Sequence, residues 1–164
     1  MSKIKYQIRQ ICTDERYILE DMLYEAIFQR DNNNILPREV IEQPELNVYI
    51  DDFGKADDYC FVADVNGKIV GAVWVRILAG KVKGYGNIDD ETPEFAISLF
   101  KEYRNHGIGT ALMREMINHL LEKGYKQTSL SVAKDNYALT MYKNFGFKIV
   151  SEQEDDYLMV LALN

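Results

Sequence analysis

The sequence contains Arg104-Asn105-His106-Gly107-Ile108-Gly109 between a strand-like run, residues 93–100, and a long amphipathic segment. The first N–H groups of a helix have no intrahelical partner, and the helix dipole places its positive end beside them. Gly107 and Gly109 have no Cβ, so a phosphate group can approach the backbone closely. Arg104 adds a permanent positive charge. The stretch therefore predicts a strand, a turn and a helix whose N-terminus binds an anion.

This glycine-rich turn differs from two common phosphate-binding patterns. No Gly-Lys-Ser/Thr follows it, as a P-loop requires. The third glycine of the dinucleotide fingerprint is also missing, and Met113 lies near its place. A helix start that carries glycines without binding a ligand is the structural alternative.

Two segments resemble the GNAT N-acetyltransferase superfamily. Residues 100–112, Phe-Lys-Glu-Tyr-Arg-Asn-His-Gly-Ile-Gly-Thr-Ala-Leu, look like its acetyl-CoA-binding signature. Residues 136–142, Asn-Tyr-Ala-Leu-Thr-Met-Tyr, followed by Phe145-Gly146-Phe147, are similar to its closing segment. The two matches follow the family's order and usual separation, and together they cover about residues 93–150. Lys101 departs from the pattern, because many members carry Pro there.

The resemblance implies acetyl-CoA as co-substrate and assigns its contacts. The pyrophosphate would lie at the turn and the first residues of the helix: Arg104, Asn105, His106, Gly107, Ile108, Gly109 and Thr110. The pantetheine arm would pair with backbone groups around Ile97 and Leu99, and Asn136 would also contact the cofactor. Asn136 has an ordinary Asx turn as its alternative. We expect His106 to contribute only its backbone.

The reaction that the resemblance implies is acetyl transfer to a primary amine by direct attack. An alkyl ammonium has a pKa of about 10.4, so it must lose a proton before it can attack. Glu94 is the candidate general base, since a strand rises about 3.3 Å per residue and a cofactor anchored at the turn would reach it after roughly 20 Å. Glu91, bulk water and a merely solvated Glu94 carboxylate are the alternatives. Backbone N–H groups near Ile97 would stabilise the oxyanion.

Tyr142 is the candidate general acid. In the resemblance, the matching tyrosine lies near the cofactor sulfur and protonates the departing thiolate. A phenol with a pKa of about 10 keeps its proton at neutral pH and can donate it. The alternative is an aromatic side chain packed under the sheet.

The remaining pattern predicts a mixed α/β (α+β) fold in one domain spanning residues 1–164. Asn66-Gly67 predicts a two-residue hairpin turn. Thr13 is expected to be an N-cap, and the first helix is expected to end at a polar turn, residues 31–34. Pro44 is expected to stop the second helix. The resemblance adds a centrally splayed sheet flanked by helices, the acyl-CoA N-acyltransferase (GNAT) fold, whose central strand often carries a bulge. Strands are expected at 4–11, 59–65, 68–78, 94–100, 128–132, 147–151 and 157–163, and helices from 13, at 38–43, 107–123 and 137–144.

Length and composition limit the other possible functions. A chain of 164 residues is long enough for one core, and its net charge of −7 disfavours a nucleic-acid partner. No apolar run is long enough to cross a bilayer, so no membrane partner is expected. Cys12 and Cys60 have no metal-ligand spacing, which predicts no metal and two reduced thiols in the cytoplasm.

The acceptor amine and the assembly stay open at this level. A small polyamine, an amino-acid derivative, an antibiotic amine and a protein N-terminus are all compatible with the sequence. Trp74, Tyr49, Tyr24 and Tyr85 are candidates for lining the acceptor pocket, although core packing explains each equally well. A homodimer is the commonest closed assembly. The second function class is a non-catalytic acyl-CoA-binding or partner-binding module on the same fold.

Overall fold

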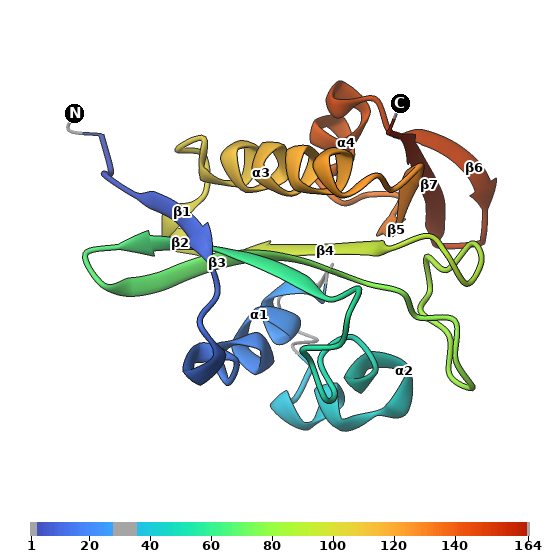
Figure 1. The fold of residues 1–164 in the computed structure, drawn as a ribbon, viewed down its shortest axis with the longest axis horizontal. Coiled ribbons are helices and arrows are strands. Elements are labelled where there is room, and N and C mark those ends of the chain that lie inside the picture. Colours follow the sequence, from blue (N-terminus) through green and yellow to red (C-terminus); the bar gives the residue numbers. More distant parts are fainter. Residues whose placement is uncertain (1–2, 28–35, 164) are drawn as a thin grey trace.

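A computed structural model of the chain describes residues 3–27 and 36–163. Seven strands form one mixed sheet in the order β1-β2-β3-β4-β5-β7-β6, with helices on both faces, which confirms the predicted fold class (Figure 1). The strands are β1 (Gln7–Gln10), β2 (Tyr59–Val65), β3 (Lys68–Arg76), β4 (Glu94–Leu99), β5 (Gln127–Ala133), β6 (Lys148–Glu152) and β7 (Asp156–Ala162). The helices are α1 (Ile18–Ala26), α2 (Pro44–Asn47), α3 (Ile108–Lys123) and α4 (Leu139–Phe145).

The two strongest local signals produce the expected elements. Asn66 (φ 52°) and Gly67 (φ 88°) form the turn between β2 and β3, because both residue types tolerate positive φ. Gly107 (φ 83°) and Gly124 (φ 86°) bracket α3 in left-handed conformations. Between them, α3 buries one stripe against the sheet: Ile108, Leu112, Met113, Met116 and Leu120.

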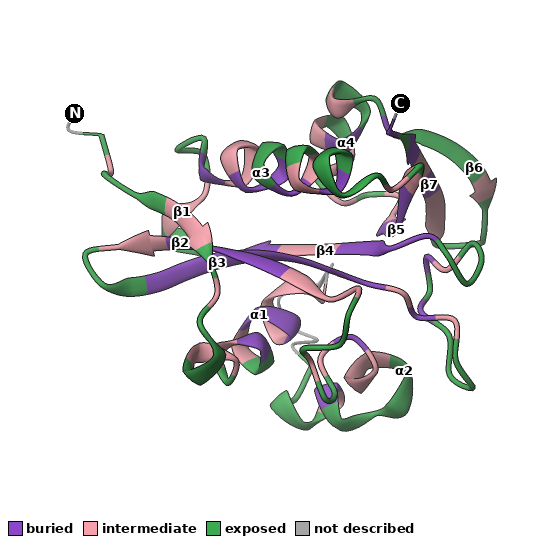
Figure 2. Cartoon of the chain, in the orientation of Figure 1, coloured by how far each residue is buried: buried purple, intermediate pink, exposed green. Residues whose placement is uncertain are grey.

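The core consists of two layers, one on each side of the sheet. Helices α3 and α4 cover one face, and α1 and α2 lie on the other (Figure 1). Strand β3 lies between the layers and is buried along its length after Lys68 (Figure 2). Because both faces are covered, its residues are a nearly continuous apolar run instead of an alternating one.

The N-terminal segment differs from its prediction. The strand at 4–11 is reduced to β1, and Thr13 is not an N-cap. Residues Thr13–Glu15 form a 3₁₀ turn whose cap position is Cys12, with the Cys12 N–H donating to the Glu15 carboxylate at 2.9 Å. Helix α1 therefore begins only at Ile18. The polar turn predicted at 31–34 lies outside the described residues.

Pro44 stops one element and begins another. A 3₁₀ turn, Arg38–Glu42, replaces the predicted helix at 38–43. The prediction that Pro44 only stops a helix was incomplete, because it occupies the first turn of α2. Proline fits there because its fixed φ is helical and its missing N–H would have had no intrahelical partner.

Strands β4 and β5 are splayed. Strand β4 pairs with β3 along its whole length, from Gly71↔Leu99 to Arg76↔Glu94, without a register shift. With its parallel neighbour β5 it shares one bridge, Glu94↔Ser129. Beyond Glu94 the two strands diverge, so this sheet opens without the bulge in β4 that the resemblance suggests.

Candidate active site

A cavity of about 750 Å³ occupies the opening between β4 and β5. Helix α1 and Tyr85, from the loop of residues 80–92, contribute to its wall, together with the start of α3 and helix α4. The cavity brings together ten of the residues singled out in the sequence: Glu94, Ile97, Leu99, Arg104, Asn105, Gly107, Gly109, Thr110, Asn136 and Tyr142. His106 is exposed and Ile108 is buried in the core, and neither lines the cavity.

The start of α3 opens onto this cavity. A Cβ added at Gly107 would meet no atom within 4 Å, and one at Gly109 would meet only the Met141 sulfur at 3.8 Å. The N–H of Ala111 donates to the carbonyl of Gly107 at 3.1 Å and closes the first turn. The N–H groups before Ala111 have no intrahelical acceptor, so the space beside the glycines suits an anion.

The side chain of Arg104 ties the turn to β4. Its Nε donates to the carbonyl oxygen of Leu99 at 3.1 Å. The guanidinium also lies over the ring of Tyr137 at 5.3 Å and 3.8 Å from the Glu25 carboxylate. Arg104 therefore supplies positive charge at the cavity wall from a position fixed by its neighbours.

The backbone of β4 turns polar groups toward the opening. The N–H of Phe100 donates to β3 at 2.9 Å, whereas the carbonyl of Pro93 accepts from β5 at 3.0 Å. Because N–H and C=O groups alternate in direction along a strand, those of Ile97 and the N–H of Leu99 face the β5 side. Beyond the single bridge, β5 has moved away from them. An extended amide chain can therefore pair with β4 there as an added strand.

Glu94 is a buried carboxylate at the other end of β4. It is 2% exposed, and its Oε2 accepts hydrogen bonds from the Tyr49 hydroxyl and from the Gly86 N–H at 3.0 Å. Burial raises the pKa of Glu94 to about 7, although the hydrogen bonds from Tyr49 and Gly86 act in the opposite direction. Glu94 is therefore not the solvated carboxylate of the alternative interpretation, and its pKa suits a general base at neutral pH.

Two glycines let the loop of residues 80–92 pack on Glu94. A Cβ at Gly84 would lie 2.1 Å from Glu94 Oε1, and a Cβ at Gly86 would lie 3.0 Å from its Cδ. A side chain at Gly84 would therefore displace the carboxylate, and one at Gly86 would also clash with the backbone of Leu130 and Ser131, at 2.8 and 2.9 Å. Glu91, the competing base, is exposed and lies outside the cavity lining.

Tyr142 is packed under the sheet, as its alternative interpretation expects, and it also reaches the cavity. Its ring packs edge-on against Phe147, with centroids 5.9 Å apart, and the residue is 8% exposed. It also lines the cavity from α4. Burial raises the pKa of Tyr142 above its usual value, and the nearby Tyr137 adds to this, so the phenol keeps a proton that it can donate.

Asn136 forms the Asx turn considered as its alternative, and it also lines the cavity. Its Oδ1 accepts a hydrogen bond from the Ala138 N–H at 2.8 Å. This bond uses one lone pair of the side-chain oxygen and leaves both hydrogens of the amide NH₂ group available to a ligand.

Of the four aromatic residues proposed for the acceptor pocket, three reach the cavity and one does not. Tyr24, Tyr49 and Tyr85 line the cavity, whereas Trp74 is buried in the core beneath α1 and α2. The contact between Tyr49 and Glu94 was not predicted, because 45 positions separate them in the sequence. His119 packs edge-on against Tyr59 at 4.5 Å, as expected for a packing residue.

Residues 3–27 and 36–163 contain neither a metal-binding cluster nor a membrane-spanning helix. Within them, no three His, Cys, Asp or Glu side chains are grouped so as to hold a metal ion. In the same part of the chain, no helix has the length and apolar character needed to cross a membrane.

Known proteins resemble this chain in sequence and in fold. The sequence profile described as "Acetyltransferase (GNAT) family" matches residues 21–147. An N-alpha-acetyltransferase of Sulfurisphaera tokodaii is 32% identical over 114 residues, which are 63% of this chain and 68% of that protein. The probable N-acetyltransferase camello of Xenopus tropicalis is 32% identical over 57% of this chain, and the match spans only 40% of its own length.

Among solved structures, the PaiA N-acetyltransferase of Thermoplasma acidophilum in complex with coenzyme A has a similar fold. Its TM-score is 0.69 at 19% identity, over 96% of this chain and 99% of that one. Because the family profile spans well over half of the chain, this protein belongs to the acetyltransferase (GNAT) family and is an N-acetyltransferase.

Proposed function

We propose that this protein transfers an acetyl group from acetyl-CoA to a primary amine by direct attack, and that residues 1–164 act as one domain. The observation that carries the proposal is the arrangement along β4. A helix N-terminus that suits phosphate lies at one end, the buried carboxylate of Glu94 lies at the other, and one cavity connects them. Acetyl-CoA has the length and the groups that this arrangement requires.

The residues of the cavity fit the two ends of acetyl-CoA. The turn at Arg104 and the N–H groups at the start of α3 hold the pyrophosphate. The carbonyl of Ile97 and the N–H of Leu99 pair with the pantetheine amides, and Asn136 donates from its NH₂ group. This placement puts the thioester near Glu94 and the sulfur on the side of Tyr142.

Three groups of the chain then act on the reaction. Glu94 receives the proton that the ammonium loses, and the amine nitrogen attacks the thioester carbonyl. The N–H of Ile97 donates to the oxyanion as the C–N bond forms. When the C–S bond breaks, Tyr142 donates its proton to the departing sulfur. The second proton on the bonded nitrogen then passes to the Tyr142 phenolate, directly or through solvent, so that a neutral amide and a neutral thiol result.

A thiol-release assay across a panel of amines tests this function. The panel contains polyamines, amino-acid amides, aminoglycoside-type amines and short peptides with free N-termini, the last because the archaeal relative is an N-alpha-acetyltransferase. Thermal unfolding adds a test that does not depend on the acceptor. Acetyl-CoA at 100 times its Kd should stabilise the protein by about 2.7 kcal/mol, while NAD and ATP should have little effect.

The non-catalytic alternative predicts a different combination of results. A pure acyl-CoA-binding module would be stabilised by acetyl-CoA but would release no thiol with any amine. The buried Glu94 and Tyr142 favour the enzyme, because cofactor binding alone requires neither. We also propose a cytoplasmic location, where the free thiols Cys12 and Cys60 would stay reduced.

Tyr142→Phe is expected to lower kcat by about 10- to 100-fold and to leave the Kd of acetyl-CoA nearly unchanged, because it removes only the donated proton. Stopped assays at saturating acetyl-CoA, together with a binding titration, measure the two quantities separately. Tyr17→Phe is the matched control, since Tyr17 is 72% exposed and lies outside the cavity lining. Parent-like turnover in Tyr142→Phe would remove its role as an acid.

A further inference from the structure

The carboxylate of Glu94 is enclosed on both of its oxygens. Oε2 already accepts two hydrogen bonds, from the Tyr49 hydroxyl and from the Gly86 N–H. Oε1 is buried without a hydrogen-bond partner among the described residues, and the Cα of Gly84 packs closely enough that a Cβ there would lie 2.1 Å away. Although Glu94 is among the residues that line the cavity, its carboxylate oxygens are buried and offer no exposed lone pair to an amine there.

The hydroxyl of Tyr49 contacts the buried carboxylate of Glu94. It donates to Glu94 Oε2 and accepts a hydrogen bond from the Tyr85 N–H at 2.9 Å. A phenol has one proton to donate and two lone pairs that can accept, so one lone pair of Tyr49 is left. Tyr49 also lines the cavity. Its oxygen is therefore a group through which a proton from the cavity can reach the enclosed carboxylate.

We propose that Tyr49 relays the proton from the acceptor ammonium to Glu94, an inference that rests on the proposed acetyl transfer. One N–H bond of the ammonium breaks as an O–H bond forms on Tyr49, and the original Tyr49 O–H bond breaks as one forms on Glu94 Oε2. Tyr49 is neutral before and after the step. The positive ammonium and the negative carboxylate become a neutral amine and a neutral acid, so no further reactant is required.

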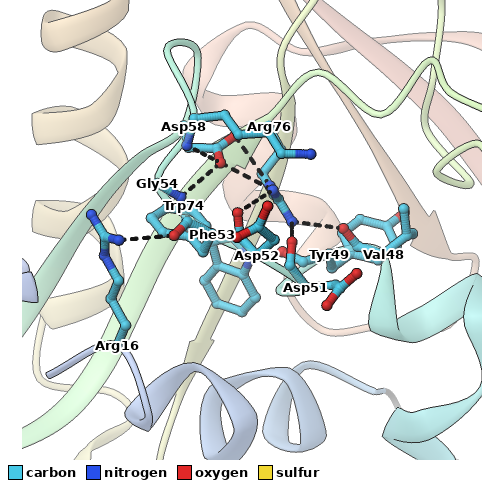
Figure 3. Close-up of polar contacts among 11 residues, drawn as sticks. Arg16, Val48, Tyr49, Asp51, Asp52, Phe53, Gly54, Asp58, Trp74 and Arg76 are labelled. Atoms are coloured by element: carbon cyan, nitrogen blue, oxygen red, sulfur yellow. Dashed lines mark hydrogen bonds and ion pairs between the residues drawn. The ribbon is translucent and has the colours of Figure 1, made fainter. Parts of the chain in front are cut away.

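Hydrogen bonds from β3 hold the backbone at Tyr49 and on both sides of it (Figure 3). The indole N–H of Trp74 donates to the carbonyl oxygen of Tyr49 at 3.0 Å. Arg76, at the end of β3, donates to the carbonyls of Val48 at 2.9 Å and Asp51 at 2.7 Å. These acceptors flank Tyr49 in the sequence, so the backbone around Tyr49 is fixed to the same strand that pairs with β4.

Asp58 in turn fixes Arg76. Its carboxylate accepts from Arg76 Nε at 3.1 Å and Nη2 at 3.0 Å, and from the N–H groups of Gly54 and Lys55 at 2.9 Å each. Arg76 is the cross-strand partner of Glu94, but its charge is thus matched by Asp58 in a buried ion pair. The titratable group that contacts Glu94 is Tyr49, and the backbone of Tyr85 lies beside the Tyr49 hydroxyl.

Tyr49→Phe tests the relay because it keeps the ring and removes the oxygen. We expect kcat/KM for the amine to fall at least tenfold, while the Kd of acetyl-CoA and the unfolding temperature stay close to those of the parent. The acidic limb of the pH–rate profile should move to higher pH, because the ionised Glu94 loses a hydrogen-bond donor. Tyr125→Phe is the matched control: its hydroxyl also donates to a carboxylate, that of Asp57, but lies outside the cavity.

Each result of the Tyr49→Phe experiment either supports or overturns the proton relay. A lowered rate with a shifted pH profile supports the relay, provided that Tyr125→Phe behaves like the parent. A parent-like rate and pH profile in Tyr49→Phe would overturn it and leave acetyl transfer intact. A lowered rate with an unshifted profile and a lowered unfolding temperature would also overturn it, in favour of a structural role. A parent enzyme that releases no thiol with any amine would instead overturn the proposed function together with the relay.

Discussion

Replacing Glu94 by glutamine is expected to lower kcat by about 10²- to 10⁴-fold and to abolish the rise in rate near pH 7, since loss of a general base has effects of this size. The pKa of Glu94 is raised to about 7, so its carboxylate is mostly protonated below that pH and available as a base above it. The parent rate should therefore increase as the pH rises through 7. Glutamine has the same shape and cannot take up the proton.

Steady-state rates between pH 5.5 and 9 provide the measurement, and Glu91→Gln is the control. Glu91 is the alternative base and is exposed outside the cavity, so its substitution should leave the profile unchanged. An unchanged profile in Glu94→Gln, or a collapse in Glu91→Gln, would contradict the assignment of Glu94.

The stability of Glu94→Gln gives a second readout. An unperturbed glutamate has a pKa of 4.5 and burial raises the pKa of Glu94 to about 7, so the folded protein binds more protons than the unfolded chain between these values. In the parent, this group therefore makes the free energy of unfolding decrease as the pH rises from 4.5 to 7. The glutamine variant lacks this contribution and should lose less stability between pH 5 and pH 8. Thermal unfolding at the two pH values measures the difference.

Gly107→Val is expected to abolish measurable acetyl-CoA binding. The substituted position has a φ of 83°, and its Cβ would point into open space at the start of α3. Valine would fill the space proposed for the pyrophosphate, and its backbone would be strained, at a cost of roughly 1–2 kcal/mol. Isothermal titration and the acetyl-CoA thermal shift measure the loss of binding.

Gly124→Val separates strain from loss of the binding site. Gly124 ends the same helix with a φ of 86°, and a Cβ there would also meet no atom within 4 Å. It lies outside the cavity lining, so the variant should lose similar stability but keep its affinity for acetyl-CoA. Equal affinities in Gly107→Val and the parent would count against the phosphate turn, whereas equal losses in the two variants would assign the effect to strain.

The fold could be predicted from sequence where the signal is local. The Asn66-Gly67 turn and the glycines at both ends of α3 specify backbone conformations that few other residues accept, and the structure has them. The prediction was weaker where two local signals compete. Cys12, not Thr13, holds the cap position because Glu15 can reach back to the Cys12 N–H, and this begins a 3₁₀ turn before α1.

The candidate site was predictable in its cofactor half and not in its acceptor half. The residues around Gly107 are contiguous, so a motif identifies them, and their cofactor roles remain predictions. The hydrogen bonds to the Glu94 carboxylate come from Tyr49 and Gly86, which lie in separate segments of the sequence and meet only after folding. The acidic residue itself could be selected from its place at the start of β4, but neither its burial nor its hydrogen bonds could be inferred from its neighbours.

The single bridge between β4 and β5 has a mechanical consequence. Strands β1–β4 form one continuous set of ladders and β5–β7–β6 another, and Glu94↔Ser129 is the bridge between them. Few backbone hydrogen bonds therefore join the two sets, and beyond Glu94 they are held together by the apolar core that they share under α3 and α4. A strand-like ligand bound in this gap would add backbone hydrogen bonds to β4 where β5 supplies none.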